Sequence, residues 1–201
     1  GFQCAIHAIG DAGNRMALDA IAFAQRGEVD PQRRHRVEHA QVVHPDDFAR
    51  FVSLGALASM QPTHCTSDMR WAEDRVGAER VKGAYAWRTF RELDVPIPFG
   101  SDAPVEDWNP LPGLYAAITR QDADGQPTGG WYPEQRLSWH EAVAAFTHAA
   151  AYAVGREADL GRLSVGYIFD CTVLAADPRD DVRGCLDTHV AAVFVGGRRI
   201  R

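Results

Sequence analysis

Cysteine is scarce in this 201-residue chain, and its four cysteines, Cys4, Cys65, Cys171 and Cys185, lie far apart. No CxxC pair occurs, so the sequence predicts neither a zinc knuckle nor a disulfide framework. Basic residues are also in the minority, because 21 Lys and Arg against 27 Asp and Glu give a formal net charge of -6. Phosphate neutralisation needs clustered cations, so we expect no nucleic-acid partner. The one dense basic cluster, residues 33–36, is typical of a solvated start of a strand.

The chain also lacks long apolar runs, since no stretch approaches the roughly 18 residues that a membrane span requires. Its start, GFQCAIHAIGD, has neither a basic region nor a small-residue cleavage site. We therefore expect a soluble protein with reduced cysteines, cytoplasmic by default and without a membrane partner. The first residue is Gly rather than Met, and the apolar residues 2–6 follow without a lead-in. This start predicts a chain cut out of a longer protein.

Several catalytic signatures are missing as well. The sequence has no GxSxG elbow, no phosphate-binding GxxxxGK[ST] loop, and its GGW segment is not a dinucleotide fingerprint. Nucleophilic serine catalysis and nucleotide binding are therefore disfavoured.

Short apolar runs alternate with helical periodicity along the first 120 residues. The expected strands are 2–6, 36–39, 56–60 and 95–99, and the expected helices are 13–26, 45–54, a stretch within 74–93, and 111–119. Four strand–helix units in succession indicate parallel strands joined by right-handed crossovers, as in an α/β layer or barrel. A complete (β/α)8 barrel takes about 250 residues, so four units are about half of one.

The remainder of the chain changes in character. Residues 121–136 form a Gly/Pro-rich loop, long enough for a lid or rim segment. Ser138, with Glu141 three residues later, predicts a capping box that opens a helix running to about residue 154. Strands are expected at 167–175 and 190–195, with a hairpin turn at Gly196-Gly197. We place a domain boundary near residue 157, which gives units 1–157 and 158–201.

Three polar residues directly follow expected strands: His7 in HAIGD, His39 in RVEHAQ and Asp102 in FGSDAPV. Side chains at the C-terminal ends of parallel strands converge on one face, where active sites are built. Two imidazoles and a carboxylate there suit zinc or a similar divalent ion. Each residue alone has another explanation, a hydrogen-bonded structural histidine or a helix-capping aspartate. Three together favour a centre for one or two metal ions.

Four further residues are weaker candidates. Glu38 precedes His39 and is expected as a buried partner of a ligand rather than a catalyst. Gln61 and His64 follow the third strand, where they either line the substrate pocket or satisfy loop backbone. Arg120 could shape substrate binding, although rim packing is the competing explanation.

The sequence as a whole resembles a known family. The succession HAIGDAGN, RVEHAQ, SMQPTH, GAERVKGAYAWR, FGSDAPVEDWNPLPGLYAAITR and GGWYPEQRLSWHEAVAAFTHAAAY is similar to the YtcJ-like branch of the amidohydrolase family 3 domain. The resemblance spans nearly the whole chain in order and spacing. It implies the C-terminal half of a distorted TIM barrel, followed by strands of a small β-sandwich.

The resemblance also implies roles for individual residues. The family's histidines of strands five and six fall on His7 and His39, and its strand-eight aspartate falls on Asp102. Asp102 would bind the metal, take a proton from the attacking water and return it to the leaving nitrogen. The family's HxH pair of strand one and its strand-four ligand have no counterpart here. Near the end, Tyr167 and Phe169 replace the usual Lys and Ala.

These observations predict a metal-dependent hydrolase that acts on C–N bonds other than peptide bonds, in a small amide or cyclic amide. Two alternatives stay open. One is a catalytically incomplete barrel fragment that associates with itself through open strand edges. The other is deamination on the same fold, because a fold does not fix the substrate.

Overall fold

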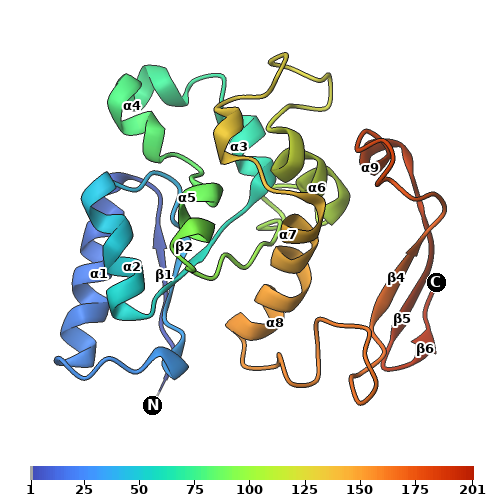
Figure 1. The fold of residues 1–201 in the computed structure, drawn as a ribbon, viewed down its shortest axis with the longest axis horizontal. Coiled ribbons are helices and arrows are strands. Elements are labelled where there is room, and N and C mark those ends of the chain that lie inside the picture. The colour runs from blue at the N-terminus through green and yellow to red at the C-terminus, as the bar shows by residue number, and fades with distance from the viewer. Residues whose placement is uncertain (1) are drawn as a thin grey trace.

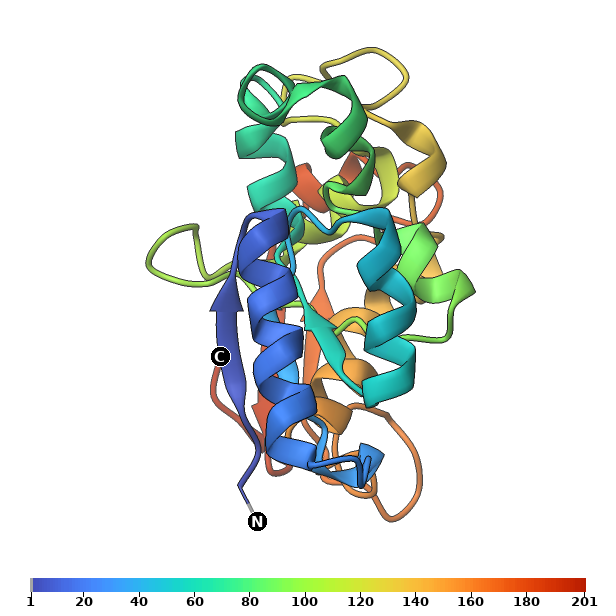
Figure 2. The same cartoon turned by 90° about the vertical axis from the view of Figure 1, so that its left-hand side faces the viewer.

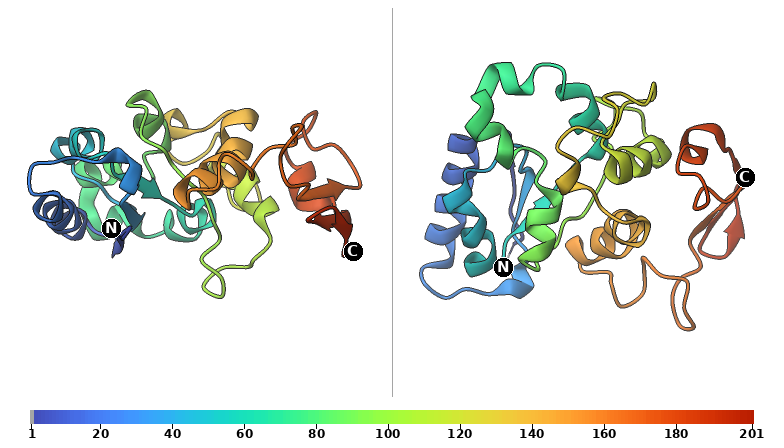
Figure 3. Two further views of the ribbon diagram at one scale, coloured as in Figure 1. Left: turned by 90° about the horizontal axis from the view of Figure 1, so that it is seen from below. Right: turned by 45° about the horizontal axis from the view of Figure 1, so that its top comes forward.

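The computed structural model describes residues 2–201, which form two small sheets with helices around and between them (Figure 1). The first sheet has the strand order β1-β2-β3 and the second has the order β4-β5-β6. The two sheets lie at opposite ends of the molecule, with α6 (Pro110–Thr119), α7 (Trp139–Ala144) and α8 (Ala150–Ala153) between them. Two further views show the same arrangement (Figure 3).

The first sheet is parallel and consists of β1 (Ala5–Ala8), β2 (Arg36–His39) and β3 (Leu57–Ser59). β2 has its predicted bounds, and its last residue lies opposite the end of β1 in the register Ala8↔His39. β1 begins three residues later than predicted. Phe2 is 93% exposed, so the apolar run extends beyond the part of the chain that the sheet covers.

Two helices pack side by side on one face of this sheet (Figure 2). α1 (Asp11–Gln25) is confirmed and ends where Arg26 adopts a left-handed φ of 50°. The predicted helix 45–54 is a 3₁₀ turn, Pro45–Asp47, followed by α2 (Phe48–Leu54). Gly55 ends α2 with a φ of 61°, as a left-handed helix terminus requires.

The segment 95–99 is not a strand, which corrects the prediction. Phe99 forms one parallel bridge with Met60, and β3 and Met60 donate backbone hydrogen bonds to the carbonyls of Pro96 and Pro98, at 3.1 and 2.9 Å. Proline has no N–H group, so these residues cannot return the hydrogen bonds that a strand ladder needs. The segment still runs beside β3 in the parallel direction and ends at the same edge of the sheet.

The middle of the chain is helical: α3 (Pro62–Asp68), α4 (Ala72–Arg80), α5 (Trp87–Glu92) and α6 (Pro110–Thr119). The predicted helical stretch within 74–93 is α4 and α5, joined by the 3₁₀ turn Val81–Gly83. α6 is confirmed. α3 was not predicted, although proline at its first residue is a favoured helix start.

The last predicted helix exists and has an irregular centre. Ser138 and Glu141 form the predicted capping box, in which each side chain binds the other residue's backbone N–H. α7 (Trp139–Ala144) leads through a π-helical turn, Ala145–Ala149, into α8 (Ala150–Ala153). The preceding loop contains only the 3₁₀ turn Pro133–Gln135.

The second sheet is antiparallel and consists of β4 (Cys171–Leu174), β5 (Val190–Val195) and β6 (Arg198–Arg199), with α9 (Gly184–Asp187) between β4 and β5. β5 has its predicted bounds, and the hairpin turn is confirmed by φ values of 56° and 77° at Gly196 and Gly197. The predicted strand 167–175 is shorter than expected.

The core lies between the parallel sheet and the middle helices. Phe51 and Phe90 are fully buried and meet edge to face, with ring centroids 4.9 Å apart, and Trp87 is buried beside Phe99. Buried aromatic pairs of this geometry add about 0.5–1.5 kcal/mol beyond the area that they bury. The contact with Trp87 anchors the 95–99 segment, and backbone hydrogen bonds hold that segment beside β3, which positions the polar residues that follow both.

The described residues form a mixed α/β fold with three parallel strands and no closed barrel. The boundary near residue 157 stays a prediction. Among residues 2–201, none of the helices is both long enough and apolar enough to cross a membrane.

Candidate metal centre

The C-terminal ends of the parallel strands bring polar side chains from distant parts of the sequence to one edge. His39 ends β2, Gln61 follows β3 and directly precedes α3, and Asp102 follows the segment beside β3. His7 lies one residue before the end of β1. The C-terminal ends of parallel strands share one edge of a sheet, so these polar side chains gather there, as the sequence predicted.

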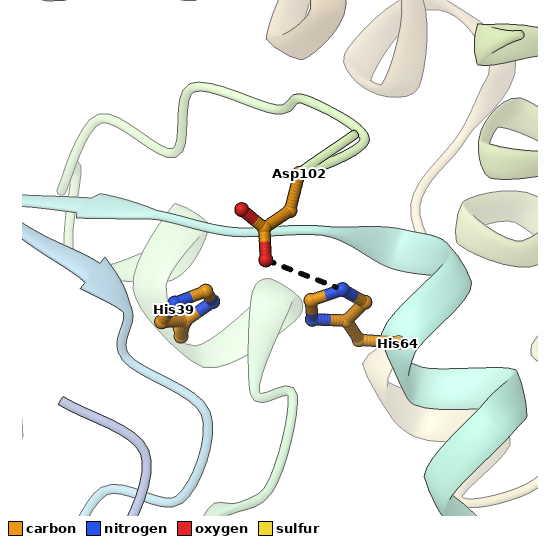
Figure 4. Close-up of side chains that lie close together, drawn as sticks. All are labelled: His39, His64 and Asp102. Atoms are coloured by element: carbon orange, nitrogen blue, oxygen red, sulfur yellow. Dashed lines mark ion pairs between the residues drawn. The ribbon is translucent and has the colours of Figure 1, made fainter. Parts of the chain in front are cut away.

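Three of these side chains form a compact group of potential metal ligands. His39, His64 and Asp102 each offer one ligand atom, and these atoms lie within 4.8 Å of one another (Figure 4). The Nε2 atom of His64 is 3.8 Å from the Oδ2 atom of Asp102, the contact that the dashed line marks. The structure thus joins two predicted ligands to His64, which the sequence indicated only as a lining residue.

His7 lies beside this group rather than within it. Its ring meets the ring of His39 edge to face, with centroids 4.6 Å apart and an interplanar angle of 76°. His39 also stacks on His64, with ring centroids 5.7 Å apart. His39 therefore contacts both of the other imidazoles.

Two members of the group hold unusual backbone conformations. His39 has a φ of 78° and Asp102 a φ of 59°, in the left-handed region that residues with a Cβ atom rarely adopt. Unlike Arg26 or Arg120, which cap helix ends, neither residue ends a helix. Strained conformations of this kind cost about 1–3 kcal/mol each and cluster at functional sites.

His64 is the most enclosed member. Its side chain is only 11% exposed, and burial lowers the pKa of the imidazole. Its Nε2 atom is buried without a hydrogen-bond partner, because 3.8 Å to Asp102 is too long for a hydrogen bond. This nitrogen therefore has a free lone pair or N–H group that faces Asp102. A buried polar atom without a partner normally costs stability.

The donor set fits a divalent metal ion. Ligands about 2.0–2.2 Å from one ion lie roughly 3–4 Å apart, and the observed separations need only small side-chain adjustments to reach that range. Imidazole nitrogens and a carboxylate oxygen are common zinc ligands. The side chain of Asp102 is 38% exposed, so a water molecule or a substrate can reach it.

Gln61 contacts the group through His39. Its side chain is 7% exposed, and its Oε1 atom lies 2.8 Å from the Nδ1 atom of His39. The predicted substrate-lining role of Gln61 stays a prediction, whereas its contact with a candidate ligand is observed.

Glu38 and Arg120 have different surroundings. Glu38 is the register partner of His7, and its carboxylate accepts a hydrogen bond from Arg36. Its role as a buried partner of a metal ligand stays a prediction. Arg120 is fully buried: it donates hydrogen bonds to the carbonyls of Tyr85 and Trp131, and burial lowers its pKa.

The guanidinium of Arg120 also lies over the indole rings of Trp87 and Trp131, at 4.6 and 5.2 Å from their centroids. Arg120 has no exposed surface, and its contacts with Trp131 hold the 121–136 loop to the core. The burial of Arg120 therefore corrects the expectation of an exposed rim position, and its predicted part in substrate binding stays a prediction.

Comparisons with known proteins show what the chain is similar to. The profile of the amidohydrolase family matches residues 1–200. The chain is 35% identical over its whole length to the protein LONG AFTER FAR-RED 3 of Arabidopsis thaliana, of which it covers 34%. It is 33% identical over 89% of its length to the putative amidohydrolase YtcJ of Bacillus subtilis, of which it covers 33%.

Among solved structures, an uncharacterised metal-dependent hydrolase from Pyrococcus horikoshii superposes with a TM-score of 0.75. The two are 30% identical, and the match covers 90% of this chain and 35% of that one. The chain thus spans about a third of the length of the relatives that it matches.

Proposed function

The chain belongs to the amidohydrolase family, and on that premise we propose that it supplies part of the metal centre of a hydrolase acting on C–N bonds. The observation that carries this proposal is the group formed by His39, His64 and Asp102, whose ligand atoms lie within 4.8 Å at the strand ends. Because the chain spans about a third of its relatives, the activity is proposed for a longer protein that contains it.

We propose that His39 and Asp102, two of the three ligands that the sequence predicted, hold the metal; the ring of the third, His7, contacts the ring of His39. His64 is placed to join them as a ligand or to face the substrate from the same side. A divalent metal, with zinc the best match to these donors, supplies Lewis acidity when bound, polarising a carbonyl and lowering the pKa of water.

The remaining chemistry falls to Asp102. Its carboxylate is partly exposed and faces the group, so it can accept the proton of the attacking water. It can then hold that proton and return it to the leaving nitrogen, which must be protonated to depart as an amine. The left-handed backbone at Asp102 turns the carboxylate into the site, and the strain is consistent with a catalytic role.

The proposed substrate is a small amide or cyclic amide. Deamination would use the same residues with ammonia as the leaving group, and only a substrate profile separates the two reactions.

The test uses the 201-residue chain and, in parallel, the longest reading frame that contains it, each loaded with zinc. We expect the longer protein to hydrolyse N-acyl or N-formyl amines and the Asp102→Asn variant to lose at least about 100-fold in kcat, the lower range for general acid–base catalysis. Zinc content measured on the same samples separates loss of proton transfer from loss of metal. Turnover by Asp102→Asn at the unmodified rate would rule out the assigned role.

A second candidate rests on the sheet edge. Within residues 2–201, β1 pairs with β2 on one side only, and Phe2 beside it is exposed. Open strand edges promote association, so the chain alone could form an inert oligomer. Light scattering together with zinc analysis distinguishes the hydrolase from the inert oligomer. A metal-free, inactive dimer, both for the 201-residue chain and for the longer protein, would favour the inert oligomer.

A further inference from the structure

Gln61 sits where a helix-capping residue is expected but does not cap. It directly precedes α3 (Pro62–Asp68), at the capping position, and its side chain makes no hydrogen bond to the first turn of that helix. Ser, Thr, Asp and Asn are the usual residues at this position because their short side chains reach the free N–H groups. The longer side chain of Gln61 instead reaches across to β2, where its Oε1 atom lies 2.8 Å from Nδ1 of His39.

This contact determines where the hydrogen of the His39 ring resides. Gln61 presents its amide oxygen to Nδ1 of His39. An amide oxygen only accepts hydrogen bonds, so in this arrangement Nδ1 carries the hydrogen and donates it. A neutral imidazole has one N–H group, which leaves the Nε2 atom with its lone pair. The lone pair on Nε2 is what a metal ion requires.

Asp102 has a ligand atom within 4.8 Å of one on His39 but forms no hydrogen bond with it, and the two rings beside His39 do not make this choice either. The His7 ring meets it edge to face and the His64 ring stacks on it, so both contacts restrict the ring plane without hydrogen bonding to a nitrogen. Among residues 2–201, the bond to Gln61 is the one hydrogen bond that the structure gives to the His39 ring. Gln61 is 7% exposed, so water competes weakly for its oxygen.

We propose that Gln61 is a positioning residue that locks His39 in the Nδ1–H tautomer and turns its Nε2 lone pair toward the metal centre. The inference rests on the proposed function in so far as His39 is a ligand, but the tautomer is a property of the metal-free chain. Outer partners of metal-binding histidines typically contribute about 10- to 100-fold in metal affinity.

The test measures the tautomer directly. The chain is labelled with ¹⁵N-histidine, freed of metal with a chelator, and examined by long-range ¹H–¹⁵N correlation at a pH where the histidines are neutral. His39→Gln assigns the signal. We expect His39 to show the Nδ1–H pattern, Gln61→Glu to keep it because a carboxylate also accepts, and Gln61→Leu to lose it.

A matched control is available on the same helix. Thr63 has a buried hydroxyl without a hydrogen-bond partner, so Thr63→Val alters the first turn of α3 without removing a hydrogen bond to His39. It should leave the tautomer unchanged. If Gln61→Leu fails to fold, Gln61→Met removes the acceptor with an unbranched side chain of similar length.

Zinc affinity, measured by competition with a chelating dye, is the second readout. We expect a loss of about 10- to 100-fold in Gln61→Leu and a smaller change in Gln61→Glu. An Nε2–H pattern in the unmodified chain, or a tautomer unchanged by Gln61→Leu, would overturn the proposal. Failure of the chain to bind zinc, with the tautomer result as expected, would count against the proposed metal centre and leave the role of Gln61 in place.

Discussion

The Nε2 atom of His64 lies 3.8 Å from the Oδ2 atom of Asp102, across a gap that neither residue closes with a hydrogen bond. The two residues approach from different elements, one from the first turn of α3 and the other from the turn after the 95–99 segment. Such a spacing is too long for a direct bond and suitable for two atoms that share an ion or a water molecule.

We expect His64→Asn to weaken zinc binding by at least about 10-fold, because it removes the buried imidazole nitrogen that faces Asp102. Competition with a chelating dye measures the change. His140→Asn is the matched control, since His140 is exposed at the start of α7 and should leave the affinity unaltered. Equal affinities for both variants and the unmodified chain would exclude His64 from the centre.

The role of His7 is tested by a pair of substitutions. The ring centroids of His7 and His39 lie 4.6 Å apart, so His7 either binds the metal or supports His39 by packing against its ring. His7→Phe keeps the ring contact and removes the lone pairs, whereas His7→Gln removes the ring. We expect both variants to lose zinc affinity if His7 is a ligand, as the family resemblance implies. Retained affinity in His7→Phe alone would assign His7 to packing.

Glu141 is expected to stabilise the fold in a pH-dependent manner. It accepts two hydrogen bonds from Arg88, at 2.8 and 2.9 Å, and others from Ser138, and the Arg88 contact above all lowers its pKa from 4.5 to about 2. A carboxyl whose pKa falls on folding stabilises the protein above the unfolded pKa and loses that contribution as pH falls through the folded pKa. Glu141→Gln should therefore cost about 2–3 kcal/mol at pH 7.

Urea unfolding followed by tryptophan fluorescence checks this between pH 7 and pH 2. The difference between the unmodified chain and Glu141→Gln should shrink as the pH drops from about 4.5 toward 2. Glu79→Gln is the control, because the pair that Glu79 forms with Lys82 is exposed and contributes little. A difference that stayed constant with pH would mean that the charge of Glu141 is not what stabilises α7.

Gly83 is expected to tolerate no side chain. A Cβ atom at Gly83 would lie 1.9 Å from the backbone oxygen of Val43, and backbone cannot move aside as a flexible side chain can. We expect Gly83→Ala to destabilise the fold by about 3 kcal/mol, at the upper end for overpacking. Gly10→Ala is the control, since nothing lies within 4 Å of its Cβ position. Similar denaturation midpoints for the two variants would contradict the close approach.

The sequence predicted most of the elements that hold the site, because their signals are local. The Ser138–Glu141 capping box and the bounds of β2 follow from short-range patterns, and they were found where expected. The same holds for the approach of His39 and Asp102, since parallel strands bring their C-terminal ends to one edge.

What the sequence did not show depends on contacts between distant residues. Two prolines prevent the 95–99 segment from completing a ladder, although the apolar pattern favoured a strand. Charged side chains are mostly exposed, so a rim position for Arg120 was the natural expectation. The indoles of Trp87 and Trp131 and the backbone carbonyls of Tyr85 and Trp131, from two segments far apart in the sequence, bury it instead. The left-handed φ of His39 likewise has no local signal.

The central claim is that His39 and Asp102 hold one divalent ion beside His64, and anomalous scattering locates that ion. Crystals of the 201-residue chain grown with zinc, with data collected on both sides of the zinc absorption edge, should show an anomalous peak within bonding distance of His39 and Asp102. The peak should disappear in crystals of His39→Gln. A peak at other residues, or none at saturating zinc, would contradict the account.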